Sequence, residues 1–157
     1  MLFRSQVHAI DRKSRAIRWK KSLIEDFGGR QPNWGVAQSP LLVNDKVILA
    51  PQSAQAALIA LDAKTGNVVW KSEPGGPMSY SSPTLTTIAG KPQVICIIGE
   101  HARTKLISVD PADGKTLWSY DGWKCGIPIP GAAPLGDGRF FITGGYNAGS
   151  VMIRVTP

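Results

Sequence analysis

A segment that ends in tryptophan occurs three times in this 157-residue chain and limits the folds that the chain can adopt. Residues 9–19, 60–70 and 108–118 align without a gap, and each copy places a tryptophan eight residues after an aspartate. The copies are 51 and 48 residues apart. Self-similarity at such a period is the sequence signature of a repeat architecture. We therefore expect one structural unit that recurs along the chain.

A second landmark stays in step with the tryptophans and helps to define the unit. Pro40, Pro83 and Pro134 lie 43 and 51 residues apart, and each opens a short run of apolar or β-branched residues. Within a period, such runs alternate with turn residues, which is typical of short strands joined by hairpins. The expected strands are 37–43, 46–50, 57–62 and 67–72 in one period, then 81–87, 93–99, 105–110 and 115–120 in the next.

A small four-stranded sheet repeated in this way is the signature of a β-propeller blade. The predicted fold class is therefore all-β, with four-stranded antiparallel blades. The chain would supply about three blade equivalents of a ring of seven or eight blades. We assign residues 6–22 to the outer half of a blade, 36–74 and 80–121 to full blades, and 130–157 to the inner half of a blade. Residues 1–5 are interpreted as a non-native scar, because they match what a common sequencing-adapter end would encode.

The repeated residues suit a hairpin that docks on the neighbouring blade. The Asp62 carboxylate can accept hydrogen bonds from the turn, Thr65 can add a hydroxyl bond, and Gly66 can adopt a positive φ. Trp70 then presents a large apolar surface with one N–H donor. Because repeat arrays are stabilised by contacts between units, we expect a structural role for the whole set. The members are Asp11, Trp19, Asp62, Thr65, Gly66, Trp70, Asp110, Gly114 and Trp118.

The string Ala60-x-Asp62-x-x-Thr65-Gly66-x-x-x-Trp70 resembles the tryptophan-docking motif of the pyrroloquinoline-quinone (PQQ) repeat family of quinoprotein-type propellers. The later copy has Ser108 and Asp113 at two of these positions, and the first copy has Ser14 and Arg15 in place of the Thr-Gly pair. The resemblance extends from about Val7 to Val155. It implies a closed ring in which the first strand of each blade lines the central axis.

Enzymes of this superfamily are PQQ-dependent alcohol and sugar dehydrogenases, so the resemblance implies PQQ, Ca²⁺ and an acidic general base as one alternative. Many of the alcohol dehydrogenases also carry two adjacent cysteines under the cofactor. Here Cys96 and Cys125 are 29 residues apart, and spacing alone leaves a disulfide between them open. We assign no catalytic residue and no metal ligand, and we expect no cofactor outside the dehydrogenase alternative.

The net charge of +7 is concentrated in the first 30 residues, where eight Lys and Arg stand against three Asp and Glu. A basic stretch without an accompanying nucleic-acid-binding signature favours a solvated strand pair, so we expect no nucleic-acid partner. No apolar run approaches the length of a membrane span, so we expect no transmembrane segment. From the family resemblance we expect a periplasmic or otherwise exported protein.

The candidate ligand-contacting residues precede the innermost strands. Residues 32–35, 78–81 and 127–130 should recur near the mouth of the central channel, and Trp34 and Tyr80 could give stacking surfaces for a sugar, a quinone or a peptide. The alternative is that both rings pack the channel wall. Residues 100–103 (Glu-His-Ala-Arg) are expected to form a charged solvent loop.

Three functional hypotheses follow. The first is a non-catalytic platform for protein partners or a small ligand at the propeller face. The scaffolding lipoprotein of the outer-membrane barrel-assembly machine is a family precedent for it. The second is a fragment of a PQQ-dependent alcohol or sugar dehydrogenase, and the third is a propeller that binds a carbohydrate or polyanion through its basic first blade. The platform is favoured because the chain has every architectural residue and no assignable catalytic one.

Overall fold

The computed structural model describes residues 2–3 and 5–156, and all of its regular elements are β-strands. The all-β prediction is therefore confirmed. Met1 and Arg4, which belong to the segment interpreted as a scar, lie outside the described residues. No helix long and apolar enough to span a membrane occurs in the described part of the chain.

The strands form four antiparallel sheets, each built from consecutive strands of the chain. The first sheet contains β1 (Leu2–Phe3), β2 (Gln6–Ile10) and β3 (Ile17–Ser22). The second contains β4 (Leu41–Val43), β5 (Lys46–Leu49), β6 (Ile59–Asp62) and β7 (Val68–Lys71). The third contains β8 (Thr84–Ile88), β9 (Lys91–Ile98), β10 (Lys105–Val109) and β11 (Thr116–Tyr120). The fourth contains β12 (Ala133–Gly136), β13 (Arg139–Thr143) and β14 (Ser150–Arg154).

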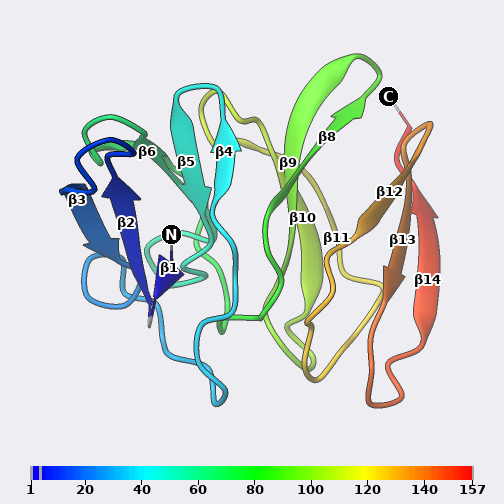
Figure 1. The fold of residues 1–157 in the computed structure, drawn as a ribbon. Helices are drawn as coiled ribbons and strands as arrows, with labels where there is room; N and C mark the ends of the chain where they lie inside the picture. The colour runs from blue at the N-terminus through cyan, green and yellow to red at the C-terminus, as the bar shows by residue number, and fades with distance from the viewer. Residues whose placement is uncertain (1, 4, 157) are drawn as a thin grey trace.

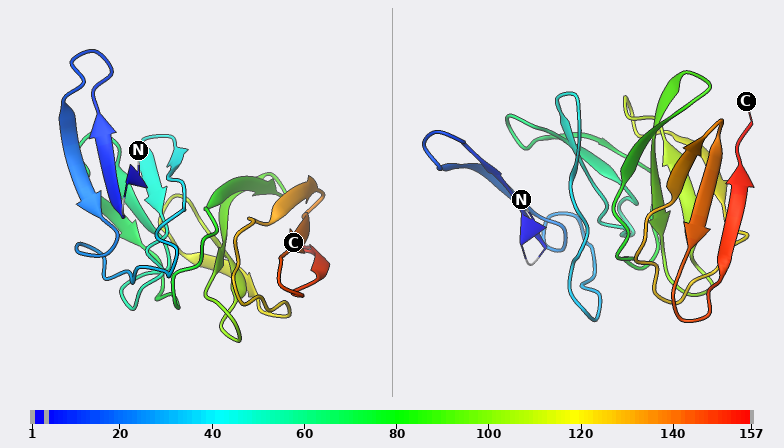
Figure 2. Two further views of the ribbon diagram at one scale, coloured as in Figure 1. Left: turned by 60° about the horizontal axis from the view of Figure 1, so that its bottom comes forward. Right: turned by 45° about the vertical axis from the view of Figure 1, so that its right-hand side comes forward.

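The sheets follow one another in chain order (Figure 1) and fan out along an arc (left view of Figure 2). Strands β4 and β8, the first strands of two neighbouring sheets, contact each other. This is the arrangement of blades in a β-propeller, where first strands converge on the axis. The chain is thus a partial β-propeller.

The innermost strands begin later than the sequence suggested. Strand β4 starts at Leu41 rather than at residue 37, and β8 starts at Thr84 rather than at residue 81. Pro40 and Pro83 directly precede them, and a proline cannot donate a hydrogen bond to a ladder. In this stretch the backbone N–H of Ser39 instead bonds the Ser82 hydroxyl at 2.9 Å.

The fourth sheet contains three strands, whereas the inner half of a four-stranded blade would contain two. Strand β14 pairs with β13 from Arg139↔Arg154 to Thr143↔Ser150. The first sheet likewise has the short strand β1 beside the expected pair, with Leu2 opposite Val7.

Each interface between neighbouring sheets is filled by an apolar cluster from both of them. Val7 and Leu23 meet Ile59 and Leu61 between the first and second sheets. The second and third sheets share a cluster that contains Ile48, Trp70, Val94 and Ile107. The third and fourth share another that contains Ile95, Leu106, Phe140 and Ile142. Because side chains alternate along a strand, β9 sends Val94 to one neighbour and Ile95 to the other, which explains its continuous apolar run.

The repeated tryptophans connect a sheet to the turn of the next sheet. The Trp70 indole N–H donates to the Pro111 carbonyl at 3.1 Å, and its ring covers Gly114. Trp19 makes the same contact one blade earlier, with the Ala63 carbonyl at 3.1 Å and with Gly66 under its ring. Both glycines have a positive φ, and a Cβ at either position would collide with the indole. The glycine is therefore needed both for the turn and for the close approach of the ring.

Trp118 differs from its two counterparts. Its indole N–H bonds the Gln93 carboxamide oxygen of its own sheet at 2.8 Å, and its ring contacts Phe140 of the fourth sheet at 5.9 Å between centroids. The described part of the chain ends before the turn that would correspond to residues 110–114. Trp118 thus packs between blades without the indole-to-turn bond.

The aspartates of the repeat hold their turns. One oxygen of Asp62 accepts from the backbone N–H groups of Lys64 and Thr65 and from the Thr65 hydroxyl, at 2.7–3.0 Å. These bonds, above all the one from the Thr65 backbone, lower the pKa of the Asp62 carboxyl below its ordinary value of 3.8. Asp11 holds the first turn in the same way although Arg15 occupies the glycine position, at a φ of 60°.

Gln52 is a buried polar link between the second and third sheets. Its carboxamide oxygen accepts from the backbone N–H groups of Ser79 and Gly99, at 2.9 and 3.0 Å, and its amide donates to the Ser79 hydroxyl at 3.0 Å. Gln38 adds a bond from its own amide to the Ser79 carbonyl at 2.9 Å. Ser79 lies in the connector that leads from β7 to β8, so these bonds fix the path of that connector.

We predict that Gly114→Ala destabilises the protein more than Gly90→Ala does. Both glycines have a φ near +77°, so an alanine at either position bears a similar backbone cost. A Cβ at Gly90 meets nothing within 4 Å, whereas one at Gly114 must displace the Trp70 ring. The expected difference in the free energy of unfolding is about 1–3 kcal/mol by urea denaturation. Equal losses would show that the ring is not seated on the turn.

We predict that Gln52→Leu lowers the free energy of unfolding by about 2–4 kcal/mol, because two buried backbone N–H groups lose their acceptor. The matched control is Gln55→Leu in the same loop, where the side chain is exposed and bonds only Lys71. We expect the control to stay within about 0.5 kcal/mol of the parent. A Gln52→Leu protein as stable as the control would contradict the role of Gln52 as a link.

We predict that Asp62→Asn weakens the acid dependence of stability. Since the folded-state pKa of Asp62 is below the ordinary 3.8, its stabilisation is complete above that pH and is lost as the pH falls toward the folded-state value. Urea denaturation at a series of acidic pH values should show a shallower decline for the variant. A decline of unchanged steepness would mean that the turn bonds do not favour the ionised carboxylate.

Candidate functional site

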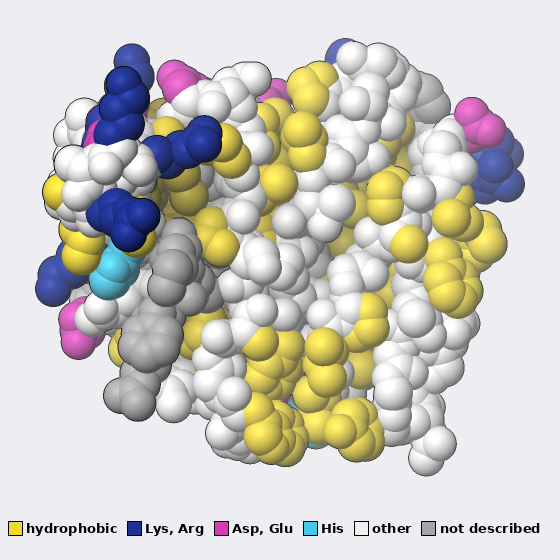
Figure 3. Space-filling model, in the orientation of Figure 1, with side chains coloured by type: hydrophobic (Ala, Val, Ile, Leu, Met, Phe, Trp, Pro, Cys, Tyr) yellow, Lys and Arg dark blue, Asp and Glu magenta, His cyan; other side chains and the backbone are white. Residues whose placement is uncertain are grey.

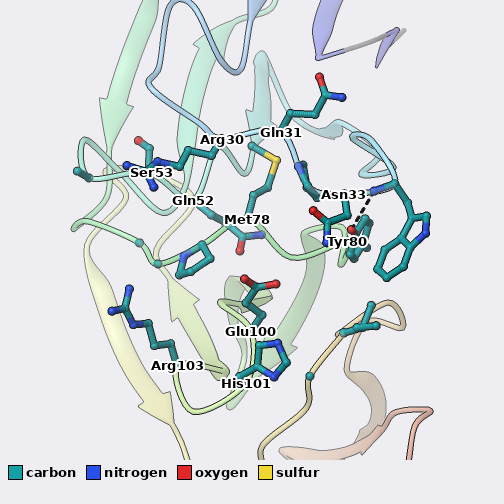
Figure 4. A pocket seen from close by; sticks show the side chains of 18 of the residues that line it. Arg30, Gln31, Asn33, Gln52, Ser53, Met78, Tyr80, Glu100, His101 and Arg103 are labelled. Carbon is teal, nitrogen blue, oxygen red and sulfur yellow. Dashed lines mark hydrogen bonds between the residues drawn. The ribbon is translucent and has the colours of Figure 1, made fainter.

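Five loops meet at one edge of the sheets and enclose a hollow of about 750 Å³. They are the connectors between blades, around residues 28–34, 75–80 and 126–127, and the loops between the second and third strands, at 52–54 and 100–103. An antiparallel meander returns to the same edge at every second turn, so alternate loops gather on one face. Figure 4 shows side chains from these loops pointing into the hollow. We call this hollow the mouth pocket.

The two aromatic candidates from the sequence lie together in the mouth pocket. The rings of Trp34 and Tyr80 are 5.9 Å apart between centroids and inclined by 50°. The Trp34 backbone N–H donates to the Tyr80 hydroxyl at 3.3 Å, the bond drawn in Figure 4. Trp34 is 69% exposed, which is unusual for so large an apolar side chain, whereas Tyr80 is half-buried.

The third predicted segment supports this arrangement from the neighbouring connector. The Tyr80 backbone N–H donates to the Pro128 carbonyl at 3.0 Å. The Ser81 hydroxyl donates to the Pro130 carbonyl at 2.6 Å, and Ile127 lines the mouth pocket. The connectors that precede β8 and β12 are therefore bonded to each other.

Several polar residues line the mouth pocket although the sequence analysis did not place them there. Residues 100–103 are exposed or half-buried, as a solvent loop should be, but this loop also forms one wall of the pocket. In Figure 4, Glu100 points from this wall toward Met78 on the opposite side, and His101 lies below it. Arg30 is a further cation of the lining.

The loop between the second and third strands has the same backbone conformation in three blades. Gln52, His101 and Tyr146 each lie three residues after the second strand of their sheet, and their φ angles are 46°, 51° and 56°. A positive φ costs about 1–3 kcal/mol for such residues. Because the strain recurs in three sheets, it belongs to the blade loop itself. The loop thus holds a constant backbone while the side chain varies from buried Gln52 to exposed Tyr146.

Cations outnumber anions in the mouth pocket. Arg30 and Arg103 are both exposed. Neither forms a salt bridge with a described residue, because the salt bridges found there involve other Lys and Arg side chains. Glu100 is the one carboxylate of the lining. A second set of cations covers the hairpin of β2 and β3 at the upper left of Figure 3, away from the mouth pocket.

The residues of the mouth pocket do not fit the Ca²⁺ that accompanies PQQ in the dehydrogenases. Calcium takes six to eight oxygen ligands, with carboxylates prominent among them. The described residues contain no group of three or more His, Cys, Asp or Glu side chains, and two arginines flank the single carboxylate of the pocket. The described residues of the mouth pocket thus offer too few carboxylates to hold a calcium ion.

The two cysteines are both free and buried. The disulfide left open by the sequence is therefore not formed in this structure. Burial raises the pKa of the Cys96 thiol to about 12, so it is inert as a nucleophile at neutral pH.

The sequence model of one family, described as outer membrane protein assembly factor BamB, matches residues 4–122. Among solved structures, a europium-containing methanol dehydrogenase matches 73% of this chain at 20% identity with a TM-score of 0.54. The chain spans about a fifth (21%) of the length of that dehydrogenase, and the likeness shows the shared fold. No curated protein matches the chain by sequence. Because the family match covers most of the chain and agrees with the repeated blades, the chain belongs to the PQQ-like β-propeller repeat family represented by this BamB model.

Proposed function

We propose that the chain is part of a non-catalytic binding platform in the cell envelope, and that the mouth pocket is its binding site. The proposal commits to protein partners, in keeping with the assembly factor after which the matching family is described. It also places the protein in the periplasm or outside the cell, because that is where proteins of this family are found. No cofactor is part of the proposal.

The observation that carries the proposal is the composition of the mouth pocket. An exposed Trp34 beside Tyr80, together with arginines that form no ion pair with any described residue, gives an accessible surface with both apolar and charged anchors. Tryptophan, tyrosine and arginine are the residues that most often dominate the energy of protein interfaces. The connector that carries Tyr80 is fixed at Ser79 by buried hydrogen bonds, so this connector would have to gain little order on binding.

The dehydrogenase alternative has weaker support from the described residues. It needs a Ca²⁺ site, and the donor set at the mouth pocket lacks the carboxylates for one. The resemblance to a methanol dehydrogenase concerns the fold, which many functions share.

We predict that a photoreactive amino acid at position 34 crosslinks to a protein partner in the cell envelope of the native host. p-Benzoylphenylalanine replaces Trp34 in the full-length protein, and Leu117 on the outer strand β11 is replaced in the control. Leu117 is also exposed, at 44%, but lies outside the mouth pocket. A discrete adduct from position 34 that is absent from position 117 is expected.

The same full-length protein provides the opposing test. After incubation with PQQ and Ca²⁺, it is assayed with a panel of alcohols and aldoses and an artificial electron-accepting dye. A platform should show no turnover above the protein-free control. Dye reduction that depends on added PQQ would overturn the proposed function in favour of the dehydrogenase.

A further inference from the structure

A second hollow of about 270 Å³ adjoins the mouth pocket. The two share Gly75, Gly76 and Arg103, so they meet along the connector that leads from β7 to β8. The second hollow continues from Arg103 to Lys105 and Lys124, on the β9–β10 and β11–β12 sides of the third sheet. We call these two adjacent hollows together the connector groove.

The connector groove has a basic end. Arg103, Lys105 and Lys124 line the second hollow, with Asp121 as its one acidic residue. Lys124 donates to the Thr104 carbonyl at 3.1 Å, which holds its ammonium group beside the groove. None of the three cations forms an ion pair with a described carboxylate. This end therefore carries uncompensated positive charge.

The opposite end is aromatic. The rings of Trp34 and Tyr80 pack against each other, 5.9 Å apart between centroids and inclined by 50°, so the exposed Trp34 ring is the surface that a ligand can reach. An exposed indole of this kind can pack against an aromatic or proline side chain of a peptide. Asn33 lies beside Tyr80 and offers a carboxamide that can bond peptide groups.

We propose that the connector groove binds an extended acidic segment of a partner protein. An aromatic or proline side chain packs on the exposed Trp34 ring beside Tyr80, and the carboxylates that follow it pair with Arg103, Lys105 and Lys124. The inference deepens the proposed function and rests on it, since it names the chemistry of the partner at the same site. Charge complementarity selects the acidic segment, because the groove carries three cations and one acidic residue at its basic end.

Binding is measured by fluorescence anisotropy with the full-length protein and two labelled octapeptides. The probe has one tyrosine followed by four Asp or Glu residues, and the matched peptide has lysine in place of each acidic residue. We expect saturable binding of the acidic peptide alone. Its affinity should fall as ionic strength rises from about 50 mM to 300 mM, because exposed charges are screened.

The decisive variant is Arg103→Glu, with Arg12→Glu as the matched control. Both arginines are exposed, and neither side chain forms an ion pair with a described residue. Both substitutions give the same change in net charge, but Arg12 lies in the β2–β3 turn, away from the connector groove. We expect Arg103→Glu to weaken binding about tenfold and the control to change it less than about twofold. Trp34→Ala should also weaken binding, and circular dichroism reports whether each variant keeps its fold.

Equal losses in Arg103→Glu and Arg12→Glu would overturn the inference, because binding would then reflect only the overall charge. Comparable binding of the lysine peptide would overturn it as well. Polygalacturonate, an anionic glycan, is tested as a third ligand. If it binds more tightly than the acidic peptide and its binding is lost in Arg103→Glu, the groove binds an anionic glycan and the inference is overturned. A position-34 crosslink without acidic-peptide binding would retain the proposed function and reject this inference alone.

Discussion

The contact between a tryptophan and the turn of the next blade sets the spacing on which the rest of the structure depends. Trp70 reaches the Pro111 carbonyl and lies flat on Gly114, and Trp19 repeats the contact one blade earlier. Each contact fixes the outer strand of one sheet against the outer hairpin of the next. The apolar clusters between the sheets then fill a gap of defined width, so stability arises from interfaces and not from single blades.

The opposite edge of the sheets is fixed by polar links. Gln52 lies in a loop of the second sheet, and it bonds the connector at Ser79 and the third sheet at Gly99. These bonds favour one arrangement of the connector, because any other would leave the buried backbone N–H groups of Ser79 and Gly99 without an acceptor. The mouth pocket is thus bounded by loops whose paths are determined before any ligand arrives. Its exposed residues, such as Trp34 and Arg103, can vary in chemistry without a change in this frame.

The repeat made the fold predictable, and long-range loop contacts made part of the site unpredictable. The aspartate and the tryptophan of the repeat, such as Asp62 and Trp70, occur in each copy at the same spacing. The strands and the contacts between blades could therefore be expected from the sequence. Trp34 and Tyr80 could be placed at the mouth because both precede inner strands. Gln52 gave no such signal, since its role depends on bonds to residues 27 and 47 positions away. Arg103 was expected in a solvent loop, and its place beside the connector follows from packing between two blades.

The central claim is that the loops of the mouth pocket form a pre-arranged binding surface. Native-state hydrogen exchange at the backbone amides of Ser79 and Gly99 tests it most directly, because both donate to the buried Gln52 carboxamide. We expect both amides to exchange as slowly as the ladder amides of β9, since their opening requires separation of the second and third sheets. Exchange as fast as that of exposed amides in the β2–β3 turn would show that the connector moves freely and would contradict the account.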